Sequence, residues 1–311
     1  MFRRVVPHLI HQSATTSSAS GGIANRHQVF ERRRRRPLRP ASIYHAVLRY
    51  HETVAGSDET ATSDNNNNKP GAKPSLPVTV TGSADNRVNP IERGAICRNT
   101  KISRQHMAPE IALHLITEEC SIYHQPISDD FCFPSEPFWG FFWPGGQALT
   151  SEFQLCRYIL DNDQLFSGRH VLDVGCGCGA SAIASKLVGA KRVTANDIDP
   201  TALQAALLNA ELNSVDLEIS GGNMIGLLRD DFDVVLIGDL FYDADIADVL
   251  IPWLTGLTAK AVDIYIGDPG RHGLTESRLR NMIQLARYQL PANVCIENNG
   301  FSHASVWKFI L

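Results

Sequence analysis

The feature that most constrains the fold is a glycine loop between two apolar segments in residues 171–200. Val-Leu leads into Asp173-Val-Gly175-Cys-Gly177-Cys-Gly179, a run of small residues follows, and a second apolar segment ends at Asp197. This pattern predicts a strand, a glycine turn, a helix and a second strand with an acidic end. Such a βαβ unit opens a doubly wound parallel sheet and binds a nucleotide-type ligand across it.

Two cofactors fit the loop. Gly175, Gly177 and Ala180 also fit the G-x-G-x-x-A spacing of dinucleotide-binding loops, so NAD is a possible cofactor as well. Asp173 favours S-adenosylmethionine, because a carboxylate there would repel a pyrophosphate and attract an ammonium and a sulfonium. Glycines at 175, 177 and 179 permit a sharp turn and a close approach to the ligand. Asp197, about twenty residues on, suits a ribose hydroxyl.

A buried fourth strand is predicted at residues 232–238, followed by Asp239-Leu-Phe-Tyr. The first and fourth strands of a doubly wound sheet are neighbours, so we expect Asp239 to lie beside Gly175. Its structural alternative is a helix cap. Asn223, after the third strand at 215–219, is a candidate adenine contact or a turn residue.

The other elements complete an α/β sheet with helices on both faces. Leu149, Phe153, Cys156 and Leu160 form a buried helical stripe, and Asp199-Pro200 predicts the cap of a helix to residue 212. A short helix is expected at 109–117, a strand at 262–267, a helix at 274–286, and closing strands at 294–297 and 305–310. Asp268 and Arg271 reach the same edge of the sheet, where a structural turn is the simpler interpretation.

Three segments carry a family resemblance: Trp-Pro-Gly-Gly-Gln-Ala-Leu at 143–149, the glycine loop, and Ala-Asn-Asp-Ile-Asp-Pro at 195–200. They resemble the seven-strand S-adenosylmethionine-dependent protein methyltransferases that act on lysine, over residues 107–311. Residues 239–242 resemble an Asp-x-Phe-Tyr signature of this family, which borders the methyl donor and the incoming lysine. The resemblance implies a protein-lysine N-methyltransferase of the mitochondrial matrix that acts on the electron transfer flavoprotein β subunit. An NAD-dependent oxidoreductase and a non-catalytic, methyltransferase-like assembly factor are the alternatives.

The candidate site residues follow from these motifs. Predicted catalytic residues are Asp239, Phe241 and Tyr242, and predicted cofactor-binding residues are Trp143, Asp173, Gly175, Gly177, Gly179, Asp197, Asn223 and Asp239. An aspartate with a pKa of about 3.9 is a poor base for a lysine of about 10.4, since a gap of about six units opposes proton transfer by roughly 8 kcal/mol. We therefore expect Asp239 to orient the amine and the cofactor, with Phe241 and Tyr242 shaping an apolar channel.

The N-terminal hundred residues look different from the rest. Residues 1–50 hold ten arginines, no lysine and one acid, which is typical of a mitochondrial transit peptide. The alternative is a nuclear or nucleic-acid-binding patch at residues 32–36. Residues 51–106 are polar and aperiodic, and we expect a disordered linker there.

Charge and cysteines limit the partners. Beyond residue 50, nineteen basic and thirty-two acidic residues give a balance of −13, which disfavours nucleic acid and favours a basic protein surface. No apolar run approaches the ~18 residues of a membrane span, so no membrane partner is expected. The seven cysteines form no disulfide framework, and Cys176 and Cys178 have the wrong spacing for zinc, so we expect reduced thiols and no metal.

Overall fold

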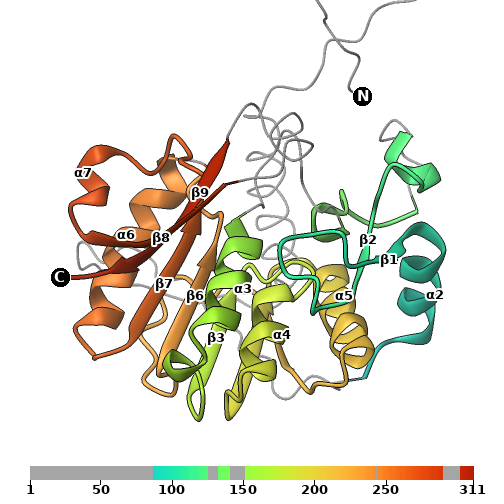
Figure 1. The fold of residues 1–311 in the computed structure, drawn as a ribbon, viewed down its shortest axis with the longest axis horizontal. Coiled ribbons are helices and arrows are strands. Elements are labelled where there is room, and N and C mark those ends of the chain that lie inside the picture. The colour runs from blue at the N-terminus through green and yellow to red at the C-terminus, as the bar shows by residue number, and fades with distance from the viewer. Residues whose placement is uncertain (1–86, 125–131, 141–150, 243, 290–301) are drawn as a thin grey trace, which may run out of the picture. The chain divides into compact units, whose positions relative to one another are not determined.

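The computed structural model describes residues 87–124, 132–140, 151–242, 244–289 and 302–311. Their main feature is a seven-stranded sheet in the order β5-β4-β3-β6-β7-β9-β8 (Figure 1). Strand β9 runs antiparallel to both of its neighbours, and the pairs from β5 to β7 are parallel. This is the doubly wound seven-strand sheet expected from the sequence. The strands are β3 (His170–Val174), β4 (Arg192–Asp197), β5 (Glu218–Gly221), β6 (Val234–Gly238), β7 (Asp263–Asp268), β8 (Met282–Gln289) and β9 (His303–Phe309).

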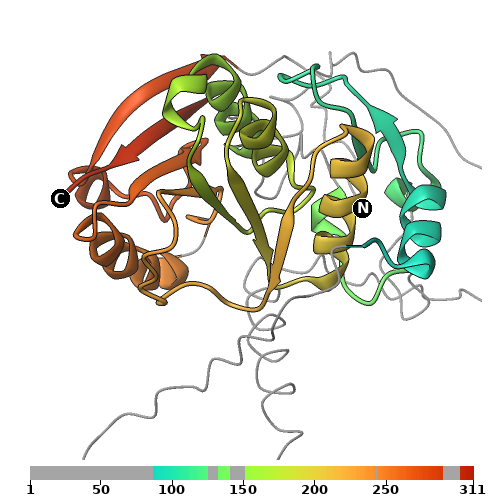
Figure 2. The same ribbon diagram turned by 90° about the horizontal axis from the view of Figure 1, so that it is seen from below.

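Helices cover both faces of this sheet. One face packs against α3 (Ser151–Asp161), α4 (Ala180–Leu187) and α5 (Pro200–Leu212). The other packs against α6 (Ala244–Thr258) and the short α7 (Glu276–Leu279). Figure 2 shows α6 and α7 (orange) on the side of the sheet opposite to α3 and α4 (green). Within the described ranges, no helix is both long and apolar enough to cross a bilayer.

The centre of the sheet is the switch point between β3 and β6. All five residues of β6 are buried, as a continuous apolar run predicts for a strand covered on both faces. Val171 to Val174 of β3 pair in parallel with Val234 to Ile237 of β6. The chain leaves β3 toward β4 on one side and returns to β6 on the other. The carboxyl ends of these strands therefore form one edge, where ligands bind in this class of fold.

The predicted start of α5 is confirmed. Asp199 Oδ1 accepts a hydrogen bond of 2.8 Å from Thr201 N, and Pro200 occupies the first helical position. Such a cap stabilises a helix by about 1 kcal/mol. The helix then buries Ala206 and Ala210 against the sheet and Leu207 and Leu208 on its other side.

Helices and strands of the described part begin before residue 107. Helix α2 (Pro90–Asn99) and strand β1 (Lys101–Ser103) lie in the stretch expected to be a linker, and β2 (Leu113–Leu115) replaces the helix expected at 109–117. The missed signal is Asn89-Pro90: Asn89 Oδ1 accepts from Ile91 N at 2.9 Å and starts the helix. Completely buried Ile96 then packs with residues of α5. Short 3-10 turns lie at Ser121–His124, Phe138–Gly140 and Asp163–Leu165.

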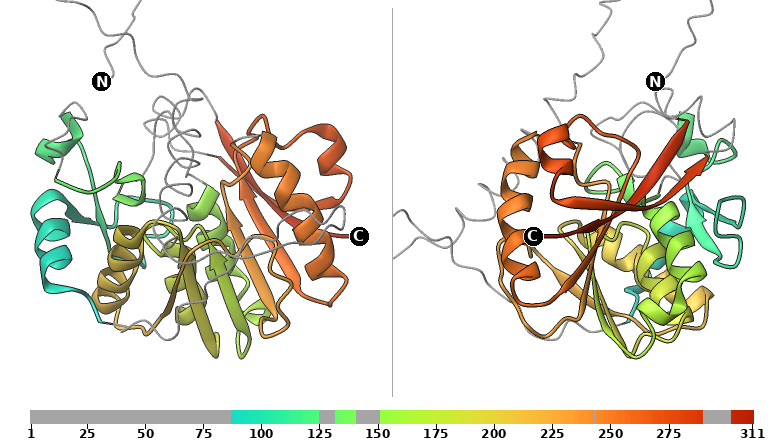
Figure 3. Two further views of the ribbon diagram at one scale, coloured as in Figure 1. Left: turned by 180° about the vertical axis from the view of Figure 1, so that it is seen from behind. Right: turned by 60° about the vertical axis from the view of Figure 1, so that its left-hand side comes forward.

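The C-terminal third also differs from expectation. The helix predicted at 274–286 is wrong, because α7 ends at Leu279 and β8 begins at Met282. Strand β8 pairs with β9, from Met282 opposite Phe309 to Gln289 opposite His303. The hydrophobic pattern of this segment does not decide between helix and strand, and the pairing with β9 makes it a strand. Figure 3 shows β8 and β9 (red) closing the sheet beside β7. The strand expected at 294–297 lies outside the described residues, as does the N-terminal segment 1–86.

Candidate active site

The glycine loop connects β3 to α4 at the switch point. Gly175, Gly177 and Gly179 have φ angles of +69°, +50° and +80°, all in the left-handed region that favours glycine. A Cβ at Gly179 would lie 2.8 Å from Ala206 Cβ, so this glycine lets α4 approach α5. A Cβ at Gly175 would lie 3.1 Å from the Leu240 side chain. Packing inside the protein therefore requires a glycine at 179, whereas at Gly175 the Leu240 side chain would have to shift by a few tenths of an ångström.

Two buried asparagines hold this loop in place. The backbone oxygen of Asn196 accepts a hydrogen bond from Cys176 N, and Asn209 Nδ2 donates one to Cys178 O, both at 2.9 Å. Asn209 Oδ1 also accepts from His114 N at 2.7 Å, which ties β2 to the loop through α5. Asn209 was not among the residues predicted from the sequence, although an asparagine inside a helix is an unfavourable choice that signals a tertiary role.

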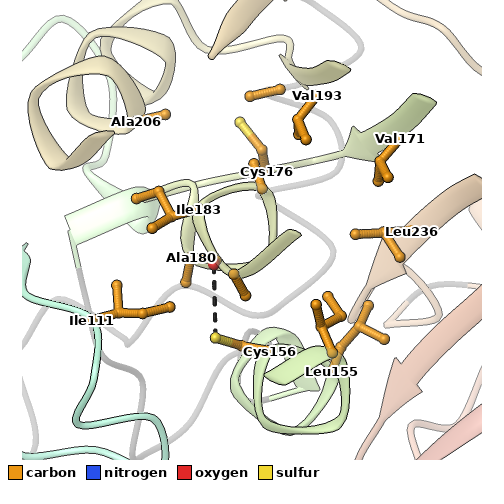
Figure 4. Close-up of a cluster of buried hydrophobic side chains, with 14 of the residues drawn as sticks. Ile111, Leu155, Cys156, Val171, Cys176, Ala180, Ile183, Val193, Ala206 and Leu236 are labelled. Atoms are coloured by element: carbon orange, nitrogen blue, oxygen red, sulfur yellow. Dashed lines mark hydrogen bonds between the residues drawn. The ribbon is translucent and has the colours of Figure 1, made fainter. Parts of the chain in front are cut away.

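Cysteines line the interior side of the loop. Cys176 and Cys178 are buried in the core between the sheet and α3–α5, and no disulfide joins the six described cysteines. Figure 4 shows the Cys156 thiol of α3 donating to Ala180 O of α4, at 3.6 Å. Burial raises the pKa of the Cys156 thiol well above its usual value. Its place in the core is therefore that of a small apolar residue, not of a nucleophile.

Asp173, at the end of β3, is the buried acid of the loop. Its side chain is 1% exposed, and Oδ2 accepts from Ala182 N in the first turn of α4 at 3.0 Å. Oδ1 has no hydrogen-bond partner among the described residues. Burial raises the pKa of this carboxyl to about 7; the Ala182 hydrogen bond lowers it and the charge of Asp197 raises it further. An unpaired buried acceptor of this kind fits a ligand with a cationic donor such as an ammonium.

Asp197, at the end of β4, braces the loop from the other side. Oδ2 accepts from Gly177 N and Oδ1 from Asp199 N, both at 2.9 Å. Burial raises the pKa of the Asp197 carboxyl to about 6, although both hydrogen bonds lower it. Each carboxylate oxygen has a second lone pair, so these bonds leave capacity for ribose hydroxyls.

The structure gives Asn223 a turn role. Its Oδ1 accepts from Ile225 N at 2.9 Å, and the residue is exposed just after β5. This is the turn alternative considered from the sequence. The adenine contact stays a prediction, because the amide nitrogen can still donate to a ligand.

Asp239 follows β6 and is completely buried in an ion pair that the sequence did not predict. Arg271 Nε donates to Asp239 Oδ1 and Arg271 Nη2 to Oδ2, each at 2.9 Å, and Arg271 is only 8% exposed. Asp239 also has a φ of +46°, a strained conformation for a residue with a side chain. Such strain persists only where the surrounding structure enforces it, and it is commonest at functional sites. The next residue, Leu240, lies near the loop, since a Cβ added to Gly175 would be 3.1 Å from its side chain.

Asp268, at the end of β7, completes the acidic edge. Its Oδ1 accepts from Gly270 N at 2.6 Å and from Arg271 N at 2.7 Å, so it fixes the turn that carries the arginine. Burial raises the pKa of the Asp268 carboxyl to about 7, and the charge of Asp239 raises it further, while the hydrogen bonds of this turn lower it. The pairing of Gly238 with Gly267 places Asp239 and Asp268 side by side.

The remaining predicted site residues lie in different environments. Phe241 is completely buried in the core under α6, and its backbone oxygen accepts from Gly273 N at 3.0 Å. Tyr242 is partly buried. Trp143 lies outside the described residues. Phe241 therefore supports the segment that carries Asp239 from inside the core.

Comparisons with known proteins identify relatives of this chain. Residues 149–262 match the family model "Ribosomal protein L11 methyltransferase (PrmA)". The electron transfer flavoprotein beta subunit lysine methyltransferase of Danio rerio is 42% identical, over 75% of this chain and 86% of that protein. The human protein of the same name is 40% identical, over 68% of this chain and 79% of that protein. A crystal structure of ribosomal protein L11 methylase from Lactobacillus delbrueckii subsp. bulgaricus aligns at 19% identity and a TM-score of 0.41, covering 68% of this chain and 98% of that one.

These relatives decide between the two cofactors that the glycine spacing left open, in favour of S-adenosylmethionine. The residues present fit that cofactor, because Asp173 offers an unpaired acceptor beside a loop of three left-handed glycines. By its similarity over most of their length, the chain belongs to the electron transfer flavoprotein β subunit lysine methyltransferase family, whose members are S-adenosylmethionine-dependent protein-lysine methyltransferases.

Proposed function

We propose that this protein transfers methyl groups to lysine side chains of the electron transfer flavoprotein β subunit in the mitochondrial matrix. The observation that carries the proposal is the 42% identity to a relative of that name, over 86% of the relative's length. The arginine-rich, acid-poor residues 1–50 support import into mitochondria. The acidic balance of the rest of the chain supports binding of a basic, lysine-bearing surface.

Bound S-adenosylmethionine would supply a methyl group on a positively charged sulfur. Asp173 would bind the ammonium of its amino-acid part through Oδ1, the atom left without a partner among the described residues. Asp197 would accept from the ribose hydroxyls, and Asn223 would contact the adenine amino group. Gly175, Gly177 and Gly179 would let the loop backbone approach the cofactor, and Trp143 would form a wall of its pocket.

Asp239 would orient the incoming lysine amine. Its use as a proton acceptor would disrupt the bidentate pair with Arg271, in addition to the unfavourable proton transfer described above. The lysine would instead lose its proton to water before the site closes. Held rigidly by Arg271, Asp239 would align the amine and the methyl group, and Tyr242 would border the apolar path of the lysine stem. Phe241 would contribute by keeping this segment fixed on the core.

The test is methyl transfer with the full chain. Purified wild type, Asp239→Ala and Asp216→Asn would each be incubated with labelled S-adenosylmethionine and recombinant electron transfer flavoprotein. We expect label on the β subunit with wild type and loss of most of it with Asp239→Ala. Asp216→Asn removes an aspartate whose side chain is 92% exposed, so it controls for the loss of a negative charge alone.

Two results would contradict the proposal. Cofactor binding with no label on the β subunit would favour another substrate or the non-catalytic alternative. Full turnover by Asp239→Ala would show that this carboxylate does not position the amine. The location is tested separately: a fluorescent protein fused after residues 1–106 should enter mitochondria, and nuclear accumulation would favour the alternative address signal.

A further inference from the structure

Asn209, in the second half of α5, joins the glycine loop to strand β2. The residue is completely buried. Its Nδ2 donates to Cys178 O in the loop at 2.9 Å, and its Oδ1 accepts from His114 N in β2 at 2.7 Å. Asparagine is unfavourable inside a helix, and burying an amide costs free energy unless the amide is hydrogen-bonded. The stability of α5 alone therefore does not explain an asparagine at this position.

The loop requires such a contact, because glycines flank Cys178 on both sides. Gly177 and Gly179 have φ angles of +50° and +80°, and glycine gives the backbone many alternative conformations. Gly179 N donates to Cys176 O at 2.7 Å, and Asn209 Nδ2 donates to Cys178 O. The peptide unit between Cys178 and Gly179 is therefore held at its N–H group by the loop itself and at its carbonyl group by α5.

Strand β2 determines the orientation of the Asn209 amide. A backbone N–H group only donates and a backbone carbonyl group only accepts, so His114 N requires the amide oxygen and Cys178 O requires the amide nitrogen. Without His114 N, the amide is free to rotate by a half-turn and to place its oxygen against Cys178 O, where no hydrogen bond forms. The position of β2 thus controls the contact that holds the loop.

Helix α2 holds β2 in turn, and both lie beside α5 (Figure 1). Thr100 Oγ1 donates to Ile96 O of α2 at 2.7 Å and lies 3.0 Å from His114 Nδ1. Because the hydroxyl has one hydrogen, the histidine nitrogen is the donor in the second bond. Completely buried Ile96 packs against α5, and Arg93 forms an ion pair with Glu211 of the same helix. The contacts therefore run from α2 through β2 to the glycine loop.

We propose that Asn209 is a positioning residue for the cofactor, through which residues 88–115 (α2, β1 and β2) set the affinity for S-adenosylmethionine. The inference rests on the proposed function in one respect, namely that the glycine loop binds the cofactor. A loop that leaves its binding conformation in the free protein lowers the apparent affinity by the fraction of molecules that remain competent. By thermodynamic linkage, bound cofactor strengthens the contact between Asn209 and His114 by the same factor.

The first test measures cofactor binding and needs no methyl acceptor. S-adenosylhomocysteine would be titrated calorimetrically into the full chain as wild type, Asn209→Ala and Asn213→Ala. Asn213 is the matched control, one helical turn further on: it accepts from Ala112 N at 2.8 Å and donates to Ala112 O at 2.6 Å. Its printed bonds join α5 to the segment before β2 and not to the glycine loop. We expect Kd to rise about tenfold or more in Asn209→Ala and to stay within about twofold in Asn213→Ala.

Urea unfolding of the same variants separates positioning from a purely structural role. A structural role alone would lower the unfolding midpoint of Asn209→Ala and leave its Kd as in wild type. That result would overturn the proposal, as would an equal rise of Kd in Asn213→Ala. In methyl transfer, Asn209→Ala should raise the KM for S-adenosylmethionine about tenfold or more and change kcat by less than about twofold, because bound cofactor holds the loop in place. A fall in kcat with an unchanged KM would contradict the assigned role.

The second test uses wild type alone, so it decides the proposal even if Asn209→Ala does not fold. Hydrogen exchange would be measured at the amides of His114 and Ala112, with and without saturating S-adenosylhomocysteine. Both amides donate to an asparagine side chain at α5, and only that of Asn209 is bonded to the loop. Linkage predicts that the cofactor slows exchange at His114 by about fivefold more than at Ala112. Equal slowing of the two amides would refute the coupling between β2 and the loop.

Failure of the proposed function would look different. Wild type would then bind S-adenosylhomocysteine without methylating the flavoprotein β subunit. The titration and the exchange measurement would still decide the role of Asn209, because neither contains a methyl acceptor. Wild-type affinity in Asn209→Ala would reject the positioning role even if the flavoprotein is methylated.

Discussion

The buried Asp173 carboxylate lowers the free energy of unfolding of the ligand-free protein, and we expect cofactor binding to remove this loss. Its carboxylate is 1% exposed, and Oδ1 has no hydrogen-bond partner among the described residues. In Asp173→Asn the amide oxygen can replace Oδ2 as the acceptor from Ala182 N, and the buried negative charge disappears. We therefore expect the variant to be more stable than wild type without ligand and to lose the cofactor.

The magnitude follows from the pKa of this carboxyl, which burial raises from 3.8 to about 7. A raised folded-state pKa means that the group's contribution to stability is fully present below the unfolded value near 4 and is lost as the pH rises through 7. The shift corresponds to about 4 kcal/mol of lost unfolding free energy at pH 8, and to about 2 kcal/mol at pH 5. The stabilisation of Asp173→Asn should therefore halve between pH 8 and pH 5.

The assay is urea unfolding of wild type, Asp173→Asn and the control Asp216→Asn at both pH values, without ligand and with saturating S-adenosylmethionine. Without ligand, Asp173→Asn should have the highest midpoint at pH 8. With ligand, only wild type and the control should gain stability, because a ligand stabilises the state that binds it. The reasoning is refuted if Asp173→Asn is less stable than wild type at pH 8 without ligand, or if it retains wild-type affinity for the cofactor.

Two further substitutions test the packing and charges around the site. Arg271→Met should lower the unfolding free energy by about 3–5 kcal/mol, because it removes one partner of a buried ion pair with Asp239. The double variant Asp239→Asn/Arg271→Met should recover part of this loss in urea unfolding. Gly179→Ala should cost about 2–4 kcal/mol, since it combines a φ of +80° with a Cβ placed 2.8 Å from Ala206 Cβ. Gly222→Ala is the matched comparison, with a φ of +87° and open space around it, and should cost only about 1–2 kcal/mol; equal losses for the two glycine variants would contradict the packing argument.

Short sequence motifs correctly predicted the glycine loop, the start of α5 and the buried strand β6. The glycine loop has the left-handed φ angles that its three glycines suggest, and Asp199-Pro200 starts α5 as expected. Strand β6 is buried along its whole length, as its apolar run indicates. In each case the decisive interaction lies within a few residues of the motif, or depends only on burial.

Contacts between distant segments account for what the sequence did not reveal. Arg271 looks like a turn residue, and its pairing with Asp239 depends on β6 and β7 being adjacent in the sheet. Helix α2 is short and polar, with only Ile96 fully buried, so its periodicity gives no signal without α5 beside it. The edge strand β8 mixes exposed apolar and polar residues and has no clear period of its own. Pairing with β9 defines it as a strand.

The arrangement of acids explains why this edge suits a positively charged ligand. Strands β3, β4 and β6 end side by side, and each is followed or closed by an aspartate: Asp173, Asp197 and Asp239. Among these three carboxylates, an ion pair with a basic side chain of the described residues is formed by Asp239, whereas burial raises the pKa of both Asp173 and Asp197. A ligand that carries an ammonium and a sulfonium lowers the cost of keeping these two groups ionised, and a pyrophosphate would increase it. The same glycine geometry would serve either cofactor, so we propose that the Asp173 carboxylate, and not the turn, favours S-adenosylmethionine.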